Sequence, residues 1–196
     1  MDKQVEFFFD VGSPTPYLAW TQLPALCRHS GATLVYRPML LGGVFQATGN
    51  ASPVSVPAKG RYMLDDMARY ARRYGVAFQM NPHFPINTLT LMRAATGVQL
   101  RSPQHLPAYL QAVMQAMWVQ GLDLGDPQVL AQTWRASGLD PAEVAEGAND
   151  AATKSALRAN TEEAVARGVF GAPTFFVGTQ MFFGQDRLDW VREALA

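Results

Sequence analysis

The amino-acid sequence predicts an α/β fold in which one sheet, formed by the two ends of the chain, encloses an all-helical insertion. Strand-like apolar segments occur near the two ends, at residues 5–10 and 32–38 and again at 174–177 and 180–183. Between them, about 110 residues show apolar side chains at helical spacing instead of strand-like alternation. The expected order is therefore β-α-β, a helical block, then β-β-α.

The first β-α-β unit follows from the residues that begin and end its elements. Residues 5–10 are an apolar run rich in phenylalanine, which fits a buried parallel strand. Ser13 then occupies a helix N-cap position and Pro14 the first helical position, where its missing N–H costs nothing. The helix is expected over residues 13–30. A second strand at residues 32–38 completes the unit, parallel to the first because such connections are normally right-handed.

The middle of the chain divides into a loop and a series of helices. Residues 40–59 are rich in Gly, Pro, Ser and Asn and are expected to form a long loop, and loops of this length tend to be functional. Apolar spacing from Arg61 to Gly75 predicts a helix. Prolines exclude regular structure at residues 81–88. Further helices are expected at residues 88–98, 103–120, 127–137, 141–146 and 151–168.

The chain closes with a predicted hairpin and a helix. Residues 174–183 read as two short strands joined by the two-residue turn Gly178-Thr179, and residues 187–195 read as the last helix. The expected domains are a sheet-containing domain at residues 1–40 and 168–196, and an insertion domain, the loop and its helices, at residues 41–167.

Composition limits the kinds of partner. With 196 residues, 48% hydrophobic and a net formal charge of zero, the chain fits one domain with an insertion and shows no basic cluster for nucleic acid or acidic membranes. The single cysteine, Cys27, cannot form an internal disulfide, and neither a signal peptide nor a long apolar run is evident. We therefore expect a cytoplasmic protein in a reducing compartment. The three histidines lack metal-ligand spacing, so no metal is expected.

Ser13 is the first candidate functional residue. It lies where a strand ends and a helix begins, and the free N–H groups and dipole at a helix amino terminus favour an anionic ligand. The alternative is that its hydroxyl merely caps the helix, because capping serines outnumber catalytic ones.

The order of elements is that of the thioredoxin fold, and two motifs resemble DsbA-like proteins. Residues 7–17 resemble their active-site strand, turn and helix, with Ser-Pro-Thr-Pro at residues 13–16 in the place of Cys-x-x-Cys. Residues 170–175, Phe-Gly-Ala-Pro-Thr-Phe, resemble the loop whose cis-proline faces that motif. Oxygen cannot form the mixed disulfide of thiol exchange. Serine in place of the attacking cysteine instead resembles the family of kappa-class glutathione transferases and 2-hydroxychromene-2-carboxylate isomerases.

This resemblance implies that glutathione is the cofactor and Ser13 the catalytic residue, donating a hydrogen bond to the glutathione thiolate. Lys59 suits a carboxylate of the tripeptide. Asp186 suits its ammonium group, with capping of the last helix as the alternative, and Asn50 has the alternative of a turn residue. The segment Gly184-Gln185-Asp186-Arg187 resembles a Gly-Ser-Asp-Arg motif of the family. The implied cofactor-binding residues are Ser13, Asn50, Lys59, Ala172, Pro173, Gln185 and Asp186.

The substrate side of the implied site rests on the segment at residues 81–87, which resembles the isomerase branch of the family. Asn87 has the alternative of capping the helix that follows it. The implied substrate-binding residues are Arg37, His83, Phe84 and Asn87, with Tyr36, Met39 and Phe45 as weaker candidates.

The implied function is a glutathione-dependent isomerisation of an aromatic acid. 2-Hydroxychromene-2-carboxylate and trans-o-hydroxybenzylidenepyruvate, compounds of naphthalene catabolism, would be interconverted by reversible thiolate addition and bond rotation. The alternatives are a kappa-class transferase that consumes glutathione and a thioredoxin-like binding module without activity. The implied partners are a small aromatic acid and a second copy of the chain, as a homodimer.

Overall fold

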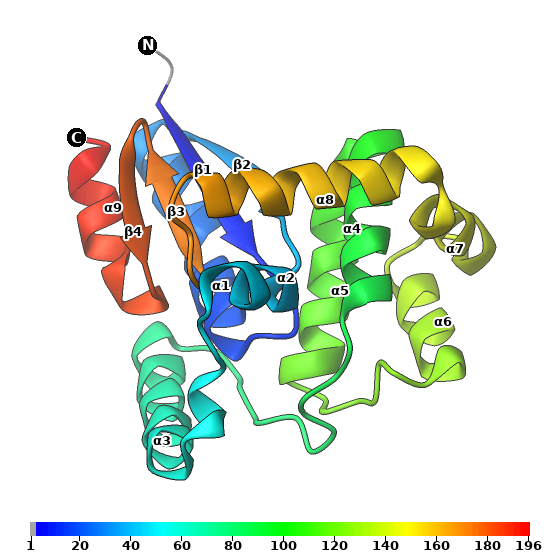
Figure 1. Ribbon diagram of the computed structural model, residues 1–196, viewed down its shortest axis with the longest axis horizontal. Helices are drawn as coiled ribbons and strands as arrows, with labels where there is room; N and C mark the ends of the chain where they lie inside the picture. Colours follow the sequence, from blue (N-terminus) through cyan, green and yellow to red (C-terminus); the bar gives the residue numbers. More distant parts are fainter. Residues whose placement is uncertain (1–2) are drawn as a thin grey trace.

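The computed structural model, which describes residues 3–196, has a four-stranded mixed sheet on one side and the helices α4 to α7 on the other (Figure 1). The strand order is β2-β1-β3-β4, with β1 and β2 parallel and β3 antiparallel to both β1 and β4. The hairpin turns at Gly178 and Thr179, as predicted. The expected β-α-β and β-β-α halves of one sheet are therefore confirmed. The strands are β1 Gln4–Phe9, β2 Thr33–Pro38, β3 Thr174–Val177 and β4 Gln180–Phe183.

Helices connect and surround the sheet. Helix α1, Pro14–Ser30, joins β1 to β2, and α9, Leu188–Ala194, follows the hairpin. Among residues 3–196, no helix is both long and apolar enough to cross a membrane. The helices between β2 and β3 are α2 Leu41–Thr48, α3 Pro57–Tyr74, α4 Leu89–Arg101, α5 Leu106–Trp118, α6 Pro127–Ala136, α7 Pro141–Asn149 and α8 Ala151–Ala166, with 3-10 turns η1 Pro53–Ser55, η2 Pro103–His105 and, before α9, η3 Gln185–Arg187.

The prediction of a long loop at residues 40–59 is wrong, because α2 and the first turn of α3 occupy much of this segment. Two adjacent glycines, Gly42 and Gly43, lower the helix propensity of this segment. Val44 is nevertheless fully buried in a core cluster, and Leu41 packs against the same cluster. Tertiary packing of this apolar side overrides the weak local preference.

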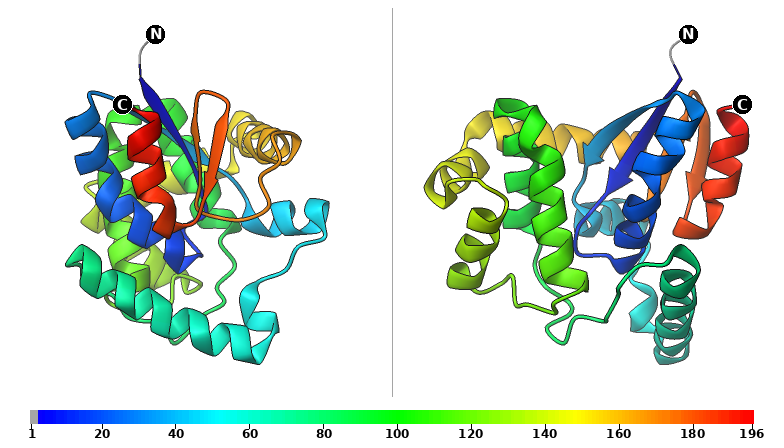
Figure 2. Two further views of the ribbon diagram at one scale, coloured as in Figure 1. Left: turned by 90° about the vertical axis from the view of Figure 1, so that its left-hand side faces the viewer. Right: turned by 180° about the vertical axis from the view of Figure 1, so that it is seen from behind.

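Alternating phenylalanines fix the two faces of the sheet. Phe7 and Phe9 pack with Phe175 in the larger core cluster, and the Phe7 and Phe175 ring centroids are 5.6 Å apart. Phe8 and Phe176 point the other way, into a second cluster with residues of α2 and α8. Figure 2 shows α1 and α9 on one side of the strands and α8 on the other. This period of two is that of a strand whose two faces are both buried.

The larger core continues from the sheet into the insertion. Residues of α1, α4 and α5 share this cluster, and the Trp118 indole at the end of α5 donates to the Val11 carbonyl at 2.9 Å. The division into domains at residues 1–40 with 168–196, and 41–167, therefore stays a prediction. What the packing does establish is a direct link between the insertion and the turn after β1.

Candidate active site

Ser13 lies at the amino end of α1, immediately after the turn that follows β1. Its backbone is extended and its N–H donates to the Asp10 carbonyl at 3.2 Å. The Ser13 side chain makes no capping hydrogen bond to the helix; its oxygen instead lies 3.1 Å from Thr15 Oγ1. The structure therefore does not support the capping alternative, and the half-buried hydroxyl stands at the positive end of a helix.

Thr15 connects this turn to the cis-proline loop at the other end of the chain. Its hydroxyl donates to the Ala172 carbonyl at 3.1 Å, and the Ala172–Pro173 peptide is cis, as the resemblance implied. The Pro173 carbonyl accepts from Gly184 N at 3.0 Å. Because the single Thr15 proton is donated to Ala172, the bond between the two hydroxyls requires Ser13 as its donor. Ser13 must turn away from Thr15 to donate to a ligand.

Asp10 is a site residue that the sequence interpretation missed. Asp10 is only 2% exposed, and its carboxylate accepts three hydrogen bonds. Oδ1 accepts from Gly12 N at 2.9 Å, and Oδ2 accepts from Leu41 N at 2.9 Å and Thr88 Oγ1 at 3.1 Å. Burial raises the pKa of Asp10, and the three hydrogen bonds oppose that rise. Asp10 thus joins the Ser13 turn to the start of α2 and to the segment before α4.

Gly12 explains how closely these segments approach. A Cβ atom at this position would lie 2.5 Å from Thr88 Cγ2, which is too close for any residue with a side chain. Thr88 could not then keep its place beside the Asp10 carboxylate.

A cavity of about 280 Å³ opens beside this turn. Asp10 and Gly12 lie at one side of it, and Leu40 to Gly42 and the segment 84–88 supply the rest of its lining. The structure therefore brings two predicted substrate-binding residues, Phe84 and Asn87, to the Ser13 turn. Asn87 Oδ1 also accepts from Leu89 N at 3.0 Å, which is the capping alternative. Phe84 packs against Trp118, with 6.2 Å between ring centroids, so the cavity wall is continuous with the core.

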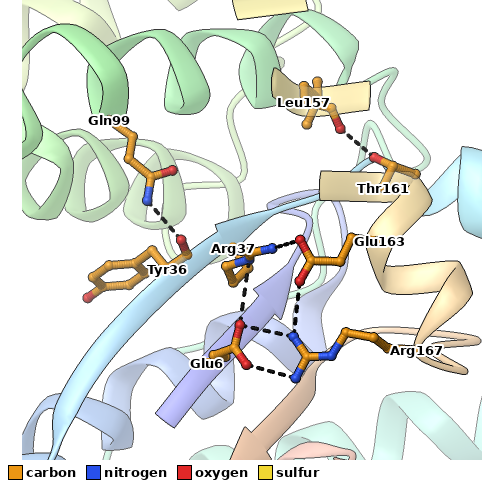
Figure 3. Close-up of polar contacts among 8 residues, drawn as sticks. All are labelled: Glu6, Tyr36, Arg37, Gln99, Leu157, Thr161, Glu163 and Arg167. Atoms are coloured by element: carbon orange, nitrogen blue, oxygen red, sulfur yellow. Dashed lines mark hydrogen bonds and ion pairs between the residues drawn. The ribbon is translucent and has the colours of Figure 1, made fainter. Parts of the chain in front are cut away.

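Arg37, a predicted substrate-binding residue, lies in an ion-pair cluster, and its role toward the substrate stays a prediction. Its guanidinium forms ion pairs with Glu163 of α8 and Glu6 of β1, in a cluster with Arg167 (Figure 3). Glu6 precedes the end of β1 by three residues, so the guanidinium reaches away from the cavity and toward the middle of the strand. Two carboxylates already balance this charge, and the cluster fixes α8 against the sheet.

The other candidates for substrate binding lie outside the lining of this cavity. His83 is exposed, and its Nδ1 lies 3.7 Å from Asp123 Oδ2. The Tyr36 ring packs on Phe7 and Phe9 in the core, and Met39 is fully buried in the second core cluster. None of these side chains, nor that of Phe45, is part of the cavity lining.

Two predicted cofactor residues adjoin the cis-proline loop or the hairpin that follows it. Asn50 donates from Nδ2 to the Phe170 carbonyl at 2.7 Å, while its Oδ1 accepts from Ala51 N at 2.8 Å in the expected turn. Gln185 is buried, and its carbonyl accepts from the Tyr74 hydroxyl at 2.6 Å. Burial raises the pKa of Tyr74 to about 12, which keeps this donor protonated at neutral pH.

The two predicted charged groups lie near opposite ends of α3. Lys59 is exposed in the first turn of α3. Asp186 lies near the last turn of α3, because the preceding residue, Gln185, accepts a hydrogen bond from Tyr74 at the end of that helix. Asp186 pairs with Arg187 and keeps a partly exposed carboxylate.

These elements define a thioredoxin-fold protein with serine in place of the attacking cysteine and a helical insertion. Residues 4–196 match the DSBA-like thioredoxin domain, and the chain belongs to that family. It is 32% identical over 197 residues to the 2-hydroxychromene-2-carboxylate isomerase of Sphingobium xenophagum, covering 100% of this chain and 99% of the relative. Within the DsbA-like proteins, the chain therefore belongs to the family of the 2-hydroxychromene-2-carboxylate isomerases.

Two further similarities agree with this placement. Glutathione S-transferase kappa 1 of Rattus norvegicus is 29% identical over 202 residues, covering 95% of this chain and 88% of the relative. A solved structure of a 2-hydroxychromene-2-carboxylate isomerase has a TM-score of 0.88 at 28% identity, covering 98% of this chain and 94% of the other.

Proposed function

We propose that this protein is a glutathione-dependent isomerase that interconverts 2-hydroxychromene-2-carboxylate and trans-o-hydroxybenzylidenepyruvate. The observation that carries the proposal is the position of Ser13. Its hydroxyl stands at the amino end of α1, is joined through Thr15 to the cis-proline loop, and lies in the turn that borders the cavity. The relative from Sphingobium xenophagum supports the choice of substrate.

The residues around Ser13 fit glutathione. The tripeptide supplies a thiolate that adds reversibly to a conjugated carbon, so that the adjoining bond can rotate. The amino end of α1 lowers the pKa of a thiol held there, and Ser13 donates a hydrogen bond to its anionic form. The backbone at Ala172 and Pro173 offers an edge to an extended peptide. Lys59 and Asp186 offer opposite charges for the two ends of the ligand.

The cavity beside the turn fits the aromatic part of the substrate. Phe84, Pro85 and Ile86 supply apolar surface on one side and Leu40 and Leu41 on the other. A ring in contact with these apolar side chains lies next to the Ser13 turn. Asn87 at the same wall provides polar atoms for an oxygen of the substrate.

Catalytic use of glutathione separates isomerisation from conjugation. With a trace of glutathione and excess 2-hydroxychromene-2-carboxylate, we expect many turnovers per glutathione and an unchanged concentration of free thiol. The open-chain product is followed by absorbance while free thiol is titrated. Omission of glutathione should stop the reaction, because the only cysteine, Cys27, is buried. Loss of one thiol per turnover would instead identify a kappa-type transferase, whose relatives are almost as similar.

The affinity for glutathione tests the predicted cofactor residues. Lys59→Ala and Asp186→Ala should each weaken binding by about 1.5 kcal/mol, roughly tenfold, as expected for one hydrogen-bonded charge at a partly exposed site. Calorimetric titration measures the change. Arg135→Ala, which removes an exposed cation on α6, serves as the control and should bind like the wild type. Wild-type affinity in both test variants would place the cofactor elsewhere.

A further inference from the structure

A second cavity, of about 710 Å³, lies between α2, α4 and α8. Leu40 lines both this cavity and the smaller one beside Ser13, and Leu89 of this cavity directly follows Thr88 of the other. The two cavities are therefore neighbours. In Figure 1, α8 runs from α4 toward the side of the sheet that carries α2. The apolar lining of this second cavity includes Leu40, Ala47, Leu89, Leu157 and Val165.

Three cations converge on this apolar lining. Arg93 comes from α4, and Lys154 and Arg158 come from consecutive turns of α8. Within residues 3–196, none of the three forms an ion pair, and the one carboxylate in the lining belongs to Glu162. Lys154 and Arg158 lie four residues apart on α8 and repel each other, whereas Glu162, one turn beyond Arg158, offsets part of this charge.

The ion pairs at the carboxyl end of α8 provide a direct contrast. There, Arg167 is paired with both Glu163 and Glu6, so each positive charge has an acidic neighbour (Figure 3). In the part of the chain that the structure describes, the three cations of the second cavity form no such ion pair and outnumber the single carboxylate of Glu162, which leaves a net positive charge for a ligand.

The α2 wall of the cavity is fixed by hydrogen bonds. Leu40 N donates to Thr161 Oγ1 at 3.0 Å, and that hydroxyl donates to the Leu157 carbonyl at 2.8 Å. A Cβ atom on Gly43 would lie 3.3 Å from Thr161 Cγ2, so α2 packs closely against α8 at this glycine. The apolar lining and the cations are thus held by packed helices.

We propose that this second cavity binds the carboxylate-bearing end of an aromatic acid substrate whose ring lies in the cavity beside Ser13. The proposal rests on the proposed function. Arg93 is one helical turn beyond Leu89, where the two cavities meet, which is about 6 Å along α4. An oxo-acid side chain of a few carbon atoms spans such a distance. Arg93 and Arg158 then take the role that the sequence prediction gave to Arg37, which is paired with Glu6 and Glu163.

Charge-removing variants test this assignment. Arg93→Gln and Arg158→Gln should each raise the KM for trans-o-hydroxybenzylidenepyruvate, whose carboxylate ends an open oxo-acid chain, about fivefold, and the double variant about twentyfold, on the scale of partly exposed charge pairs. The kcat should stay within about twofold and the affinity for glutathione should not change, because neither side chain lies beside Ser13. Arg135→Gln on α6 is the matched control, with wild-type kinetics. An unchanged KM in the double variant overturns the inference.

Equilibrium binding separates this inference from the proposed function. Wild-type protein titrated with trans-cinnamate and with neutral trans-cinnamamide should prefer the carboxylate, and Arg93→Gln/Arg158→Gln should lose that preference. This result supports the anion site even in a protein that does not isomerise the chromene. Equal binding of cinnamate by the wild type and the double variant overturns it, whatever the activity.

Discussion

Replacing Ser13 with alanine is expected to lower the turnover number about a hundredfold while the fold stays intact. A hundredfold loss is the scale expected when one preorganised hydrogen-bond donor to an anion, here the glutathione thiolate, is removed. The Ser13 side chain supports no backbone hydrogen bond of α1, so its removal leaves the helix unchanged. The measurement is kcat at saturating glutathione, together with the pKa of the bound thiol followed by its ultraviolet absorbance. That pKa should rise in Ser13→Ala.

A matched serine on the same helix controls this experiment. Ser30 lies at the opposite end of α1, so Ser30→Ala should retain wild-type turnover. If Ser13→Ala turned over substrate as fast as the wild type, Ser13 could not be the residue that holds the thiolate. A large loss of activity with an unchanged thiol pKa would also contradict this role.

The strands were predictable from sequence because their signals are local. The run of Phe7, Phe8 and Phe9 alternates between two buried faces, and the turn at Gly178 and Thr179 has the chemistry of a two-residue hairpin. Nothing distant is needed to recognise either. The order of these elements then identified the fold, and the loop at Pro173 identified its second half.

The features that the sequence analysis missed depend on contacts between residues that are far apart in the sequence. Arg37 was assigned to the substrate side, and its pairing with Glu163, which lies 126 residues away, could not be predicted from the sequence. The helix α2 forms because Val44 finds a buried cluster, although Gly42 and Gly43 weaken it locally. Thr15 acquires its role only when the Ala172 carbonyl, 157 residues away, comes within 3.1 Å. Local patterns do not contain such pairings.

Asp10 is the omission that had a signal. A carboxylate at the end of an apolar run, three residues before the candidate serine, is costly to bury unless several donors meet it. The structure supplies those donors from the turn, from α2 and from Thr88. The sequence could have suggested a buried acid here, but not that it joins three separate segments.

Asp10→Ala is expected to lower the free energy of unfolding by about 3 kcal/mol. The substitution leaves Gly12 N, Leu41 N and the Thr88 hydroxyl without their acceptor, and each unpaired buried donor costs about 1–3 kcal/mol. Part of that cost is offset because the buried carboxylate is itself unfavourable. Urea unfolding measures the change. Asp65→Ala, at an exposed position of α3, is the control and should stay within about 0.5 kcal/mol of the wild type.

The pH dependence of stability tests the charge state of Asp10. Burial raises the pKa of Asp10 in the folded protein above its ordinary value near 4, so the folded state holds this proton more tightly than the unfolded state. Its contribution to stability is therefore complete below that ordinary value and is lost as pH rises through the raised pKa. Other carboxylates, such as Asp150 beside Arg101, have a lowered pKa and give the opposite slope. The comparison must therefore isolate Asp10.

Asp10→Asn provides that comparison, because it keeps the shape of the side chain and removes its titration. The free energy of unfolding of the wild type minus that of Asp10→Asn should fall as pH rises above about 4, by about 1.4 kcal/mol for each unit of pKa shift. Urea unfolding over a series of pH values gives both quantities. A difference that rises over this range would show that the hydrogen bonds from Gly12, Leu41 and Thr88 outweigh burial and hold Asp10 charged. The hydrogen bonds by which Asp10 joins the turn, α2 and Thr88 would then depend on an ionised carboxylate, and lowering the pH would weaken them.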